Sequence, residues 1–222
     1  MVKKKKESLE EKRKRELLAR QDTQLKWILF VLVVIILIAV GVYFMVNSTK
    51  RFSYGGLQFE KIMFDKLPLY YSMIQLTSYD GNRINHHLYL RNDPRKLTDV
   101  LINGNIVINP TVVFAVDPES DTLCQDNPLA GGLINQFFQA NGVKYSATYT
   151  NKSYALERNM TYVDCSKVSG QQTFLALKMG NETEINQDSQ NCYTLSFKNC
   201  EVLKVTERFI VGAYANSKGI KI

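Results

Sequence analysis

The sequence lacks the short motifs by which many enzymes can be recognised. It contains no G-x-G-x-x-G and no G-x-S-x-G, and it shows no internal repeat or low-complexity tract. The pair Gly131-Gly132 lies near the start of a predicted helix, yet no lysine follows it at the spacing of a phosphate-binding loop. The pair therefore predicts close packing of a helix on a sheet rather than an anion site. These absences exclude the usual motifs of dinucleotide-binding, phosphate-loop and serine hydrolase enzymes.

Histidine, the commonest metal ligand and acid–base catalyst, is scarce. His86 and His87 are the only two histidines, and they are adjacent in a predicted strand. Neighbouring strand residues point to opposite faces of a sheet, so this pair cannot hold one metal ion together. We expect both to be ordinary strand residues, exposed or half-buried.

Three acidic residues, Asp117, Glu119 and Asp121, follow an apolar predicted strand, where α/β enzymes often place their acids. Their alternation is typical of the start of a calcium-binding loop. The pattern then fails, because Thr122 stands at the sixth position, where the loop needs glycine, and Pro128 stands at the twelfth, where it needs glutamate. We expect a solvated acidic turn, and we keep the three carboxylates as the best candidates for metal binding or acid–base chemistry.

What the sequence does contain is one long apolar run. Residues 27–46, WILFVLVVIILIAVGVYFMV, hold no charged or strongly polar side chain. As a helix they span about 30 Å, the thickness of the hydrocarbon core of a bilayer. Strands are seldom this long, and a backbone in lipid must satisfy its own hydrogen bonds, so the run predicts a transmembrane helix. A cleaved signal peptide is the alternative, but no small-x-small site follows the run, which favours an uncleaved signal-anchor.

The charge of the chain is unevenly distributed. Residues 1–26 hold ten Lys and Arg against five Asp and Glu, whereas only Lys50 and Arg51 closely follow the apolar run. The positive-inside rule therefore predicts a cytoplasmic N-terminus and an extracytoplasmic remainder. A capping box at Ser8 and Glu11 predicts a helical tail, which either attracts anionic lipid headgroups or serves only as a topology signal. The rest of the chain is almost neutral, which argues against a nucleic-acid partner.

The cysteines all lie in the predicted outward part of the chain, and no two form a C-x-x-C pair of the kind that zinc sites use. They are Cys124, Cys165, Cys192 and Cys200. In an oxidising compartment an even number predicts two disulfides, with free buried thiols as the alternative. Of the three possible connectivities we favour Cys124–Cys165 with Cys192–Cys200. If residues 193–197 are extended, however, Cys192 and Cys200 lie about 25 Å apart, and long-range pairs must replace both bridges.

Four N-x-Ser/Thr sequons also fall outside the apolar run. They begin at Asn47, Asn151, Asn159 and Asn181. In an extracytoplasmic domain each is compatible with glycosylation, although a chain this rich in Asn, Ser and Thr contains some sequons by chance.

After a polar stalk at residues 47–56, the sequence predicts a β-rich domain at residues 57–222. The expected strands are residues 57–60, 69–76, 84–90, 112–116, 143–150, 161–163 and 173–179. The turn pairs Asp80-Gly81 and Asn103-Gly104 predict hairpins, the second of them within residues 100–108. Residues 117–126 are polar and predict a loop.

Two helices are expected in this domain. The first lies between Asn127-Pro128 and Asn141-Gly142, and with the strands on either side of it makes a parallel βαβ unit. The second, at residues 200–214, has a strand as its alternative. The side chains that it would bury are Val202, Leu203, Thr206, Phe209, Ile210 and Ala213. The predicted class is therefore α+β: one N-terminal transmembrane helix, then a β-rich extracytoplasmic domain that contains a βαβ unit.

Several short segments carry a resemblance. They are residues 52–59 (FSYGGLQF), residues 89–95 (YLRNDPR), Asn191-Cys192-Tyr193 and Asn199-Cys200-Glu201. Together they resemble uncharacterised single-pass membrane proteins of small-genome archaea, over most of the outward domain. The resemblance implies an archaeal cell surface and brings no activity with it.

We predict a membrane-anchored extracytoplasmic module that binds or scaffolds components of the cell envelope without enzymatic activity, because no convincing catalytic set is present. Its expected partners are the lipid bilayer, through residues 27–46, and an envelope protein. No cofactor is expected. The alternative is a metal-dependent extracytoplasmic hydrolase that uses Asp117, Glu119 and Asp121. A third interpretation is that the basic tail recruits a cytoplasmic partner while the outer domain is only a plug.

Overall fold

The computed structural model describes residues 26–45, 50–77, 83–168 and 170–222, and the chain divides into two compact units at Lys50. The first unit contains the helix Lys26–Met45, whose mean hydropathy is 3.2 and whose apolar window is entirely unburied. In the described part of the chain it is the one helix long and apolar enough to cross a membrane. The helix predicted over residues 27–46 is therefore present as far as Met45. The predicted tail helix with its capping box lies outside the described residues.

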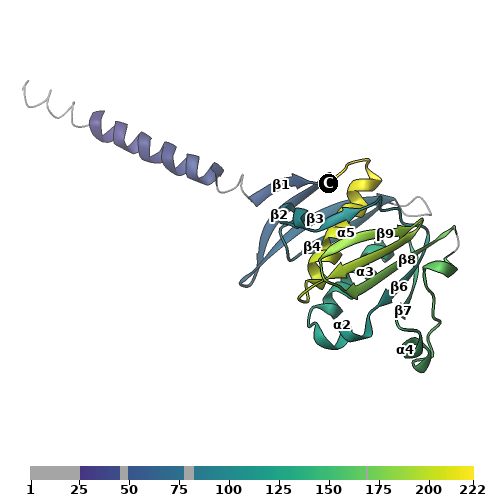
Figure 1. Cartoon of the computed structure of the whole chain (residues 1–222). Coiled ribbons are helices and arrows are strands. Elements are labelled where there is room, and N and C mark those ends of the chain that lie inside the picture. Colours follow the sequence, from purple (N-terminus) through teal and green to yellow (C-terminus); the bar gives the residue numbers. More distant parts are fainter. Residues whose placement is uncertain (1–25, 46–49, 78–82, 169) are drawn as a thin grey trace, which may run out of the picture. The chain divides into compact units, whose positions relative to one another are not determined.

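The second unit, Arg51–Ile222, begins with an antiparallel meander of four strands (Figure 1). The strands are β1 (Arg51–Tyr54), β2 (Leu57–Phe64), β3 (Leu67–Thr77) and β4 (Arg83–Leu90). The three strands predicted in this region are confirmed. Residues 51–54 of the predicted stalk form β1, because Gly55 and Gly56 adopt positive φ angles and turn the chain back onto β2. The compact unit thus begins at Arg51, whereas the sequence predicted that the domain begins at residue 57. The predicted Asp80-Gly81 turn lies outside the described residues.

A mixed six-stranded sheet forms the second layer, in the order β5-β9-β10-β8-β6-β7. Its strands are β5 (Leu101–Asn103), β6 (Thr111–Val116), β7 (Lys144–Tyr149), β8 (Gln172–Met179), β9 (Glu184–Ser189) and β10 (Cys192–Phe197). Strand β6 pairs in parallel with both β7 and β8, so the predicted central strand at residues 112–116 is confirmed. Strands β9 and β10 pair antiparallel and were not predicted.

In the described part of the second unit there are four α-helices and two 3-10 helices. They are η1 (Pro94–Asp99), α2 (Pro118–Leu123), α3 (Asn127–Ala140), α4 (Lys152–Glu157), η2 (Cys165–Lys167) and α5 (Val202–Ser217). Helix α3 begins one residue before Pro128 and ends at Ala140; Asn141 is its C-cap, and Gly142 then takes a φ of 67°. Since β6 and β7 are parallel and α3 joins them, the predicted βαβ unit is confirmed.

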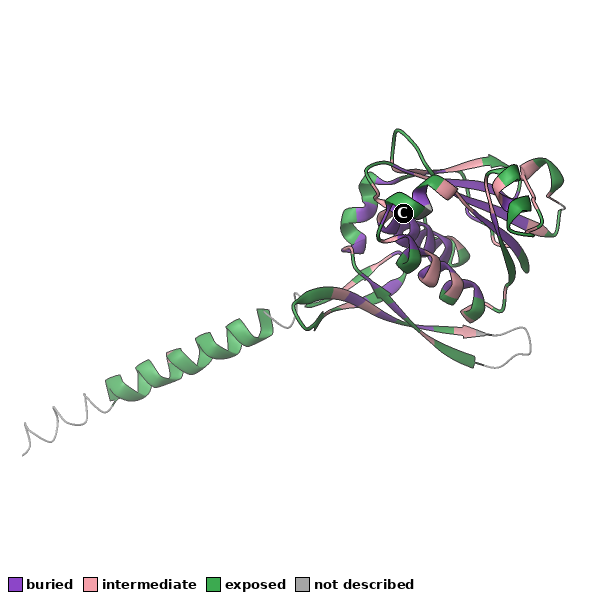
Figure 2. Cartoon of the chain, turned by 90° about the horizontal axis from the view of Figure 1, so that it is seen from below, coloured by how far each residue is buried: buried purple, intermediate pink, exposed green. Residues whose placement is uncertain are grey.

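Helix α5 lies between the two sheets and forms the centre of the core. Every described residue from Val202 to Ala215 except Lys204 is buried, and Figure 2 shows buried helical turns between the sheets. One hydrophobic cluster joins residues of α5 to Phe59 of the meander and to Leu195 of the six-stranded sheet. A helix that is apolar on all sides is typical of a fully buried position. The helix predicted at residues 200–214 is confirmed, and its strand alternative is wrong.

The opposite face of the six-stranded sheet has a smaller core of its own. Val113, Ala115 and Phe174 pack there against Val163 and neighbouring residues of the segment that follows α4. Residues 161–163 form no strand, so that prediction is wrong. Their backbone instead covers the sheet, and the Oγ1 of Thr148 donates a hydrogen bond to the carbonyl oxygen of Thr161 (3.0 Å).

The hairpin predicted within residues 100–108 is wrong. Residues 101–103 form β5, which pairs in parallel with β9, and the chain then leaves the sheet at Gly104, whose φ is 126°. The polar groups of the next residues are satisfied by side chains of the sheet instead of by a second strand. Tyr193 Oη donates to the Asn105 carbonyl oxygen (2.8 Å) and accepts from the Val107 N–H (2.9 Å), and Gln187 Oε1 accepts from the Asn105 N–H (2.9 Å).

The predicted loop at residues 117–126 is also only partly a loop. Residues 118–123 form α2, because Asp117 caps the helix and Pro118 occupies its first turn. Asp117 Oδ1 accepts from the Glu119 N–H (3.2 Å), which satisfies one of the N–H groups that a helix start leaves without a partner.

Two disulfides are present, but both favoured pairs are wrong. The bridges are Cys124–Cys200 and Cys165–Cys192, with Cα–Cα distances of 5.3 and 5.8 Å. Strand β10 begins at Cys192 and runs extended to Phe197, so Cys192 and Cys200 lie at opposite ends of an extended segment. The geometric objection to a local Cys192–Cys200 bridge therefore holds, and two long-range pairs replace both favoured bridges.

Candidate binding pocket

A pocket of about 300 Å³ opens where α3 and α5 end, beside the segment that follows β5. The lining residues are 106–110, Phe137, Asn141, Val143, Ala213, Tyr214, Asn216 and Ser217. Asn216 Nδ2 donates to the Ile106 carbonyl oxygen (2.7 Å), which fastens the segment to α5. An apolar cavity of this size with a few polar groups is the usual form of a small-ligand site.

The floor of this pocket carries a phenol that stays neutral. Tyr214 is 3% exposed, and burial raises its pKa to about 12. Asn141 Nδ2 donates to Tyr214 Oη (3.1 Å) and also to the Phe137 carbonyl oxygen (2.7 Å). Because Tyr214 Oη accepts from Asn141, its own O–H can be donated to a bound molecule.

A second donor lies in the wall. The Nδ2 atom of Asn109 is buried and has no hydrogen-bond partner among the described residues, although the Asn109 backbone N–H donates to Thr173 Oγ1 (3.0 Å). Leaving a buried donor unpaired costs about 1–3 kcal/mol. Because this atom is closed to solvent, the Asn109 side chain must turn toward the pocket before a carbonyl or hydroxyl oxygen of a ligand can pair with it and remove the cost.

Apart from the neutral phenol of Tyr214, the pocket wall has no ionisable acid or base. None of the described residues that line it is Asp, Glu, Lys, Arg, His or Cys, and Ser217 Oγ donates to the Tyr214 carbonyl oxygen (2.7 Å). This wall holds neither a nucleophile paired with a base nor a set of metal ligands. It can bind a neutral, mainly apolar group that presents one hydrogen-bond acceptor.

A second, more polar cleft of about 490 Å³ lies beside Cys200. Its charged side chains are already paired: Arg91 Nη1 lies 3.4 Å from Asp126 Oδ1, and Lys204 Nζ lies 3.5 Å from Glu201 Oε1. Lys204 also pairs with Asp99 outside the cleft. Because its charged side chains already pair with one another, the cleft is less suited to a charged ligand than the number of charged residues in its lining would indicate.

The structure shows no metal site formed by Asp117 or Glu119, the two predicted acidic ligands whose side chains are described. Asp117 caps α2 through Oδ1, and its Oδ2 accepts from the Met179 N–H (3.4 Å), while Glu119 is exposed. The side chain of Asp121 lies outside the description. Among the described His, Cys, Asp and Glu residues, one group is compact enough for a metal ion, and it consists of Asp188 and the two sulfurs of the Cys165–Cys192 disulfide. Disulfide sulfurs are not the thiolates that bind metals.

The two histidines occupy opposite faces of β4, as predicted. His87 is exposed, stacks on Tyr71 and shares a hydrogen bond of 2.9 Å between its Nδ1 and the Tyr71 Oη. His86 is half-buried, and burial together with the charge of His87 lowers its pKa.

Two other sequence-derived sites have different outcomes. Gly131 and Gly132 lie within α3, where a Cβ atom added to either would meet nothing within 4 Å, so the predicted close packing is wrong. Asn151, Asn159 and Asn181 are exposed and remain candidates for glycosylation. Asn47 lies outside the described residues.

A structurally important residue that the sequence analysis missed is Glu207. It is fully buried in α5, where its carboxylate accepts from the Arg91 N–H (2.5 Å), the Asn92 N–H (3.0 Å) and Asn92 Nδ2 (2.7 Å). Its neighbour Arg208 donates from Nη1 to Tyr54 Oη (2.7 Å). Glu207 therefore ties α5 to the turn at the end of the meander, and Arg208 ties α5 to β1. The sequence signal that could have identified Glu207 is the Glu207-Arg208 pair inside an otherwise mostly apolar helical segment.

The burial of Glu207 predicts a pH-dependent stability. Burial raises its pKa to about 7, against hydrogen bonds from Arg91 and Asn92 that lower it. Between pH 4.5 and 7 the folded protein therefore holds a proton that the unfolded chain has released, so the free energy of unfolding falls as the pH rises and levels off above pH 7. The shift corresponds to about 3 kcal/mol over this window.

Urea denaturation of the wild type and of Glu207→Gln at several pH values measures this effect. The lowered pKa of His86 makes the free energy of unfolding rise with pH, which opposes the effect of Glu207. The quantity to follow is therefore the difference in the free energy of unfolding between the wild type and the variant at each pH. Parallel stability curves for the two proteins from pH 4.5 to 7 would contradict the assignment.

Comparison of the chain with protein-family models, with curated proteins and with solved structures finds no match. The function must therefore be inferred from the geometry of the chain itself.

Proposed function

We propose that this chain is a membrane-anchored binding module of the cell envelope without enzymatic activity. The observation that carries the proposal is the uncharged pocket at Tyr214, which offers apolar walls, the Tyr214 hydroxyl and, within the wall, the unpaired donor of Asn109, but no catalytic pair. The bound group is a neutral apolar one with a carbonyl or hydroxyl oxygen, such as a side chain with an adjoining amide from an envelope protein.

The proposed topology has a cytoplasmic N-terminus, a single span at the helix Lys26–Met45 and an extracytoplasmic domain from Arg51 onward. Its support is the exposed apolar helix, the basic residues that precede it and the two disulfides, which persist in oxidising compartments. The resemblance to archaeal membrane proteins would make this envelope an archaeal one. The metal-dependent hydrolase has no comparable support, because both carboxylate oxygens of Asp117 accept from backbone N–H groups.

Ligand-observed NMR on the full chain in nanodiscs tests the binding function, with N-acetyl-leucine amide as the probe. We expect saturation transfer to the probe and its loss in Val143→Trp, which fills the mouth of the pocket from a partly buried position. Asn109→Leu should weaken binding about 5–10-fold while leaving the domain at least as stable, because it removes a buried donor that has no partner in the free protein.

The matched control is Leu156→Ala on α4, which is exposed and does not line the pocket. It should bind the probe as the wild type does. Undiminished saturation transfer in Val143→Trp would refute the assignment of this pocket.

A further inference from the structure

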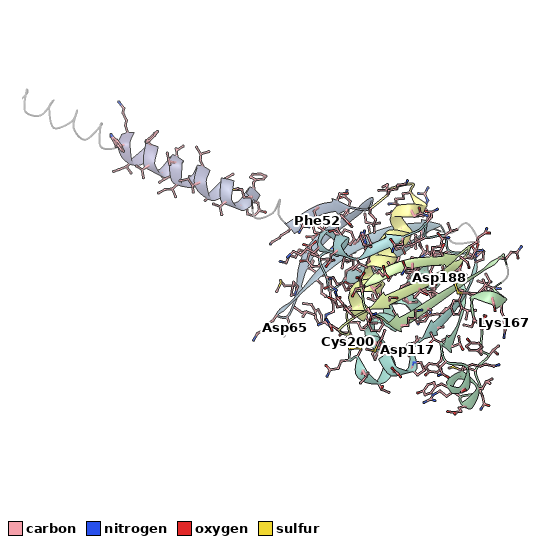
Figure 3. The ribbon with its side chains drawn as sticks, in the orientation of Figure 1. Phe52, Asp65, Asp117, Lys167, Asp188 and Cys200 are labelled. Carbon is pink, nitrogen blue, oxygen red and sulfur yellow. A yellow bond between two sulfur atoms is a disulfide. The ribbon has the colours of Figure 1, made fainter. Side chains whose placement is uncertain are left out.

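The hairpin that joins β2 and β3 extends beyond the core at the end of the meander where the chain arrives from the apolar helix. In the pairing of β1 with β2, Arg51 lies opposite Glu60, and β2 continues past that point to Phe64. Four further residues of strand correspond to about 13 Å. We call residues 61–66 the β2–β3 tip; Asp65 marks its end in Figure 3.

The β2–β3 tip is exposed on both faces. In β2 the alternation of buried and exposed side chains holds only from Leu57 to Phe59; beyond Glu60, Ile62 is half-buried and the other residues of the strand are exposed. Phe64 and Met63 are 72% and 61% exposed. Phe64 is the most exposed of the large apolar side chains described in the second unit. A hairpin end that only faced water would be expected to carry polar residues here.

The flanking residues of the β2–β3 tip are cationic. Lys61 and Lys66 are exposed, and Asp65, which turns the chain with a φ of 54°, lies between Phe64 and Lys66. An exposed aromatic side chain and a flexible apolar one between lysines are the composition by which peripheral segments bind the boundary between lipid headgroups and acyl chains.

The covalent connection limits how far this hairpin can be from the bilayer. The described apolar helix ends at Met45, and β1 begins at Arg51, so only residues 46–50 separate the two elements. Fully extended, this connection spans at most about 20 Å. A membrane that holds the helix therefore keeps the entry end of the meander, from which the β2–β3 tip projects, within a short distance of its surface.

We propose that the β2–β3 tip is a second membrane contact, in which Phe64 and Met63 enter the outer boundary of the bilayer that the helix spans and Lys61 and Lys66 bind anionic headgroups. The contact restricts the orientation of the domain. The proposal rests on the membrane span of the proposed function, and it commits to lipid rather than to a protein as the occupant of this surface.

Tryptophan fluorescence in nanodiscs of phosphatidylcholine and phosphatidylglycerol tests the proposal. Trp27 is the single tryptophan of the chain, so Trp27→Phe provides a background for Phe64→Trp and, as control, for Leu156→Trp on α4. Brominated phosphatidylcholine should quench the tryptophan at position 64 at least twofold more than the one at position 156. Adding Lys61→Glu and Lys66→Glu should reduce this quenching in nanodiscs that contain phosphatidylglycerol, but not in those that lack it.

The wild-type protein separates failure of the span from failure of the contact. Quenching of Trp27 without quenching at position 64 would overturn the proposed contact and leave the span intact, whereas an unquenched Trp27 would overturn the span on which both rest. Equal quenching at positions 64 and 156 would also overturn the proposal, because the contact would then not be specific. Shielding of position 64 only after an envelope protein is added would assign this surface to that protein instead of to lipid.

Discussion

Replacing Glu207 by leucine is expected to lower the free energy of unfolding by about 3–4 kcal/mol near neutral pH. Leucine preserves most of the side-chain volume, but the Arg91 and Asn92 backbone N–H groups that face the buried side chain of residue 207 lose their acceptor. Each unpaired buried group costs about 1–3 kcal/mol. Urea denaturation of the full chain, monitored by the circular dichroism of the domain, measures the loss.

Lys204→Leu is the matched control for Glu207→Leu, because it removes a charge one turn earlier on the same helix. Lys204 is partly exposed, and its pair with Asp99 (2.6 Å) should contribute less than about 1 kcal/mol. If the two substitutions destabilise the domain equally, the carboxylate of Glu207 is not the link between α5 and the meander.

The second large effect concerns the disulfides. Cys124→Ala with Cys200→Ala is expected to cost about 4.5 kcal/mol, because the bridge closes a loop with a sequence separation of 76 residues. Cys165→Ala with Cys192→Ala should cost about 3.5 kcal/mol for a separation of 27 residues. We therefore predict that removing Cys124–Cys200 lowers the free energy of unfolding more than removing Cys165–Cys192 does. Denaturation under non-reducing conditions measures both losses.

Peptide mapping of the non-reduced protein checks the pairing directly. We expect a peptide that links Cys124 to Cys200 and another that links Cys165 to Cys192. Peptides that link Cys124 to Cys165 would contradict the structure. Alkylation of intact cells bears on the compartment, because an extracytoplasmic domain should present no reactive thiol until it is reduced.

The parts of the fold that could be predicted from the sequence are those with strong local signals. The βαβ unit is one example, since Pro128 and Gly142 mark the two ends of α3 and apolar strands flank it. Strand β9 (EINQDS) was missed because only Ile185 in it is buried, so its assignment depends on pairing with β5 and β10 rather than on its own composition. The Asn103-Gly104 pair led to a wrong hairpin prediction for the opposite reason. Its local turn signal is strong, but side chains of the sheet form hydrogen bonds with the backbone of the residues that follow, so no second strand forms there.

The pocket could not have been predicted in this way. Asn109, Asn141 and Tyr214 are far apart in the sequence, and only the packing of α3 and of the segment that follows β5 against α5 brings them together. None of the three is an unusual residue in its own segment. The acidic trio, in contrast, was conspicuous in the sequence, yet Asp117 serves as a helix cap. The polar residue that stands out in the sequence, Asp117, thus satisfies a local backbone N–H group at a helix start. The candidate site, in contrast, depends on contacts between residues that are distant in the sequence.

The position of α5 has a consequence for how the protein is made. Both sheets precede this helix in the chain, so during synthesis their inner faces emerge before the segment that covers them. Until α5 has been synthesised, the two layers have no helix to pack against. Assembly of this domain must therefore wait until α5 has been made, which leaves a period in which chaperones and proteases can act on an open chain.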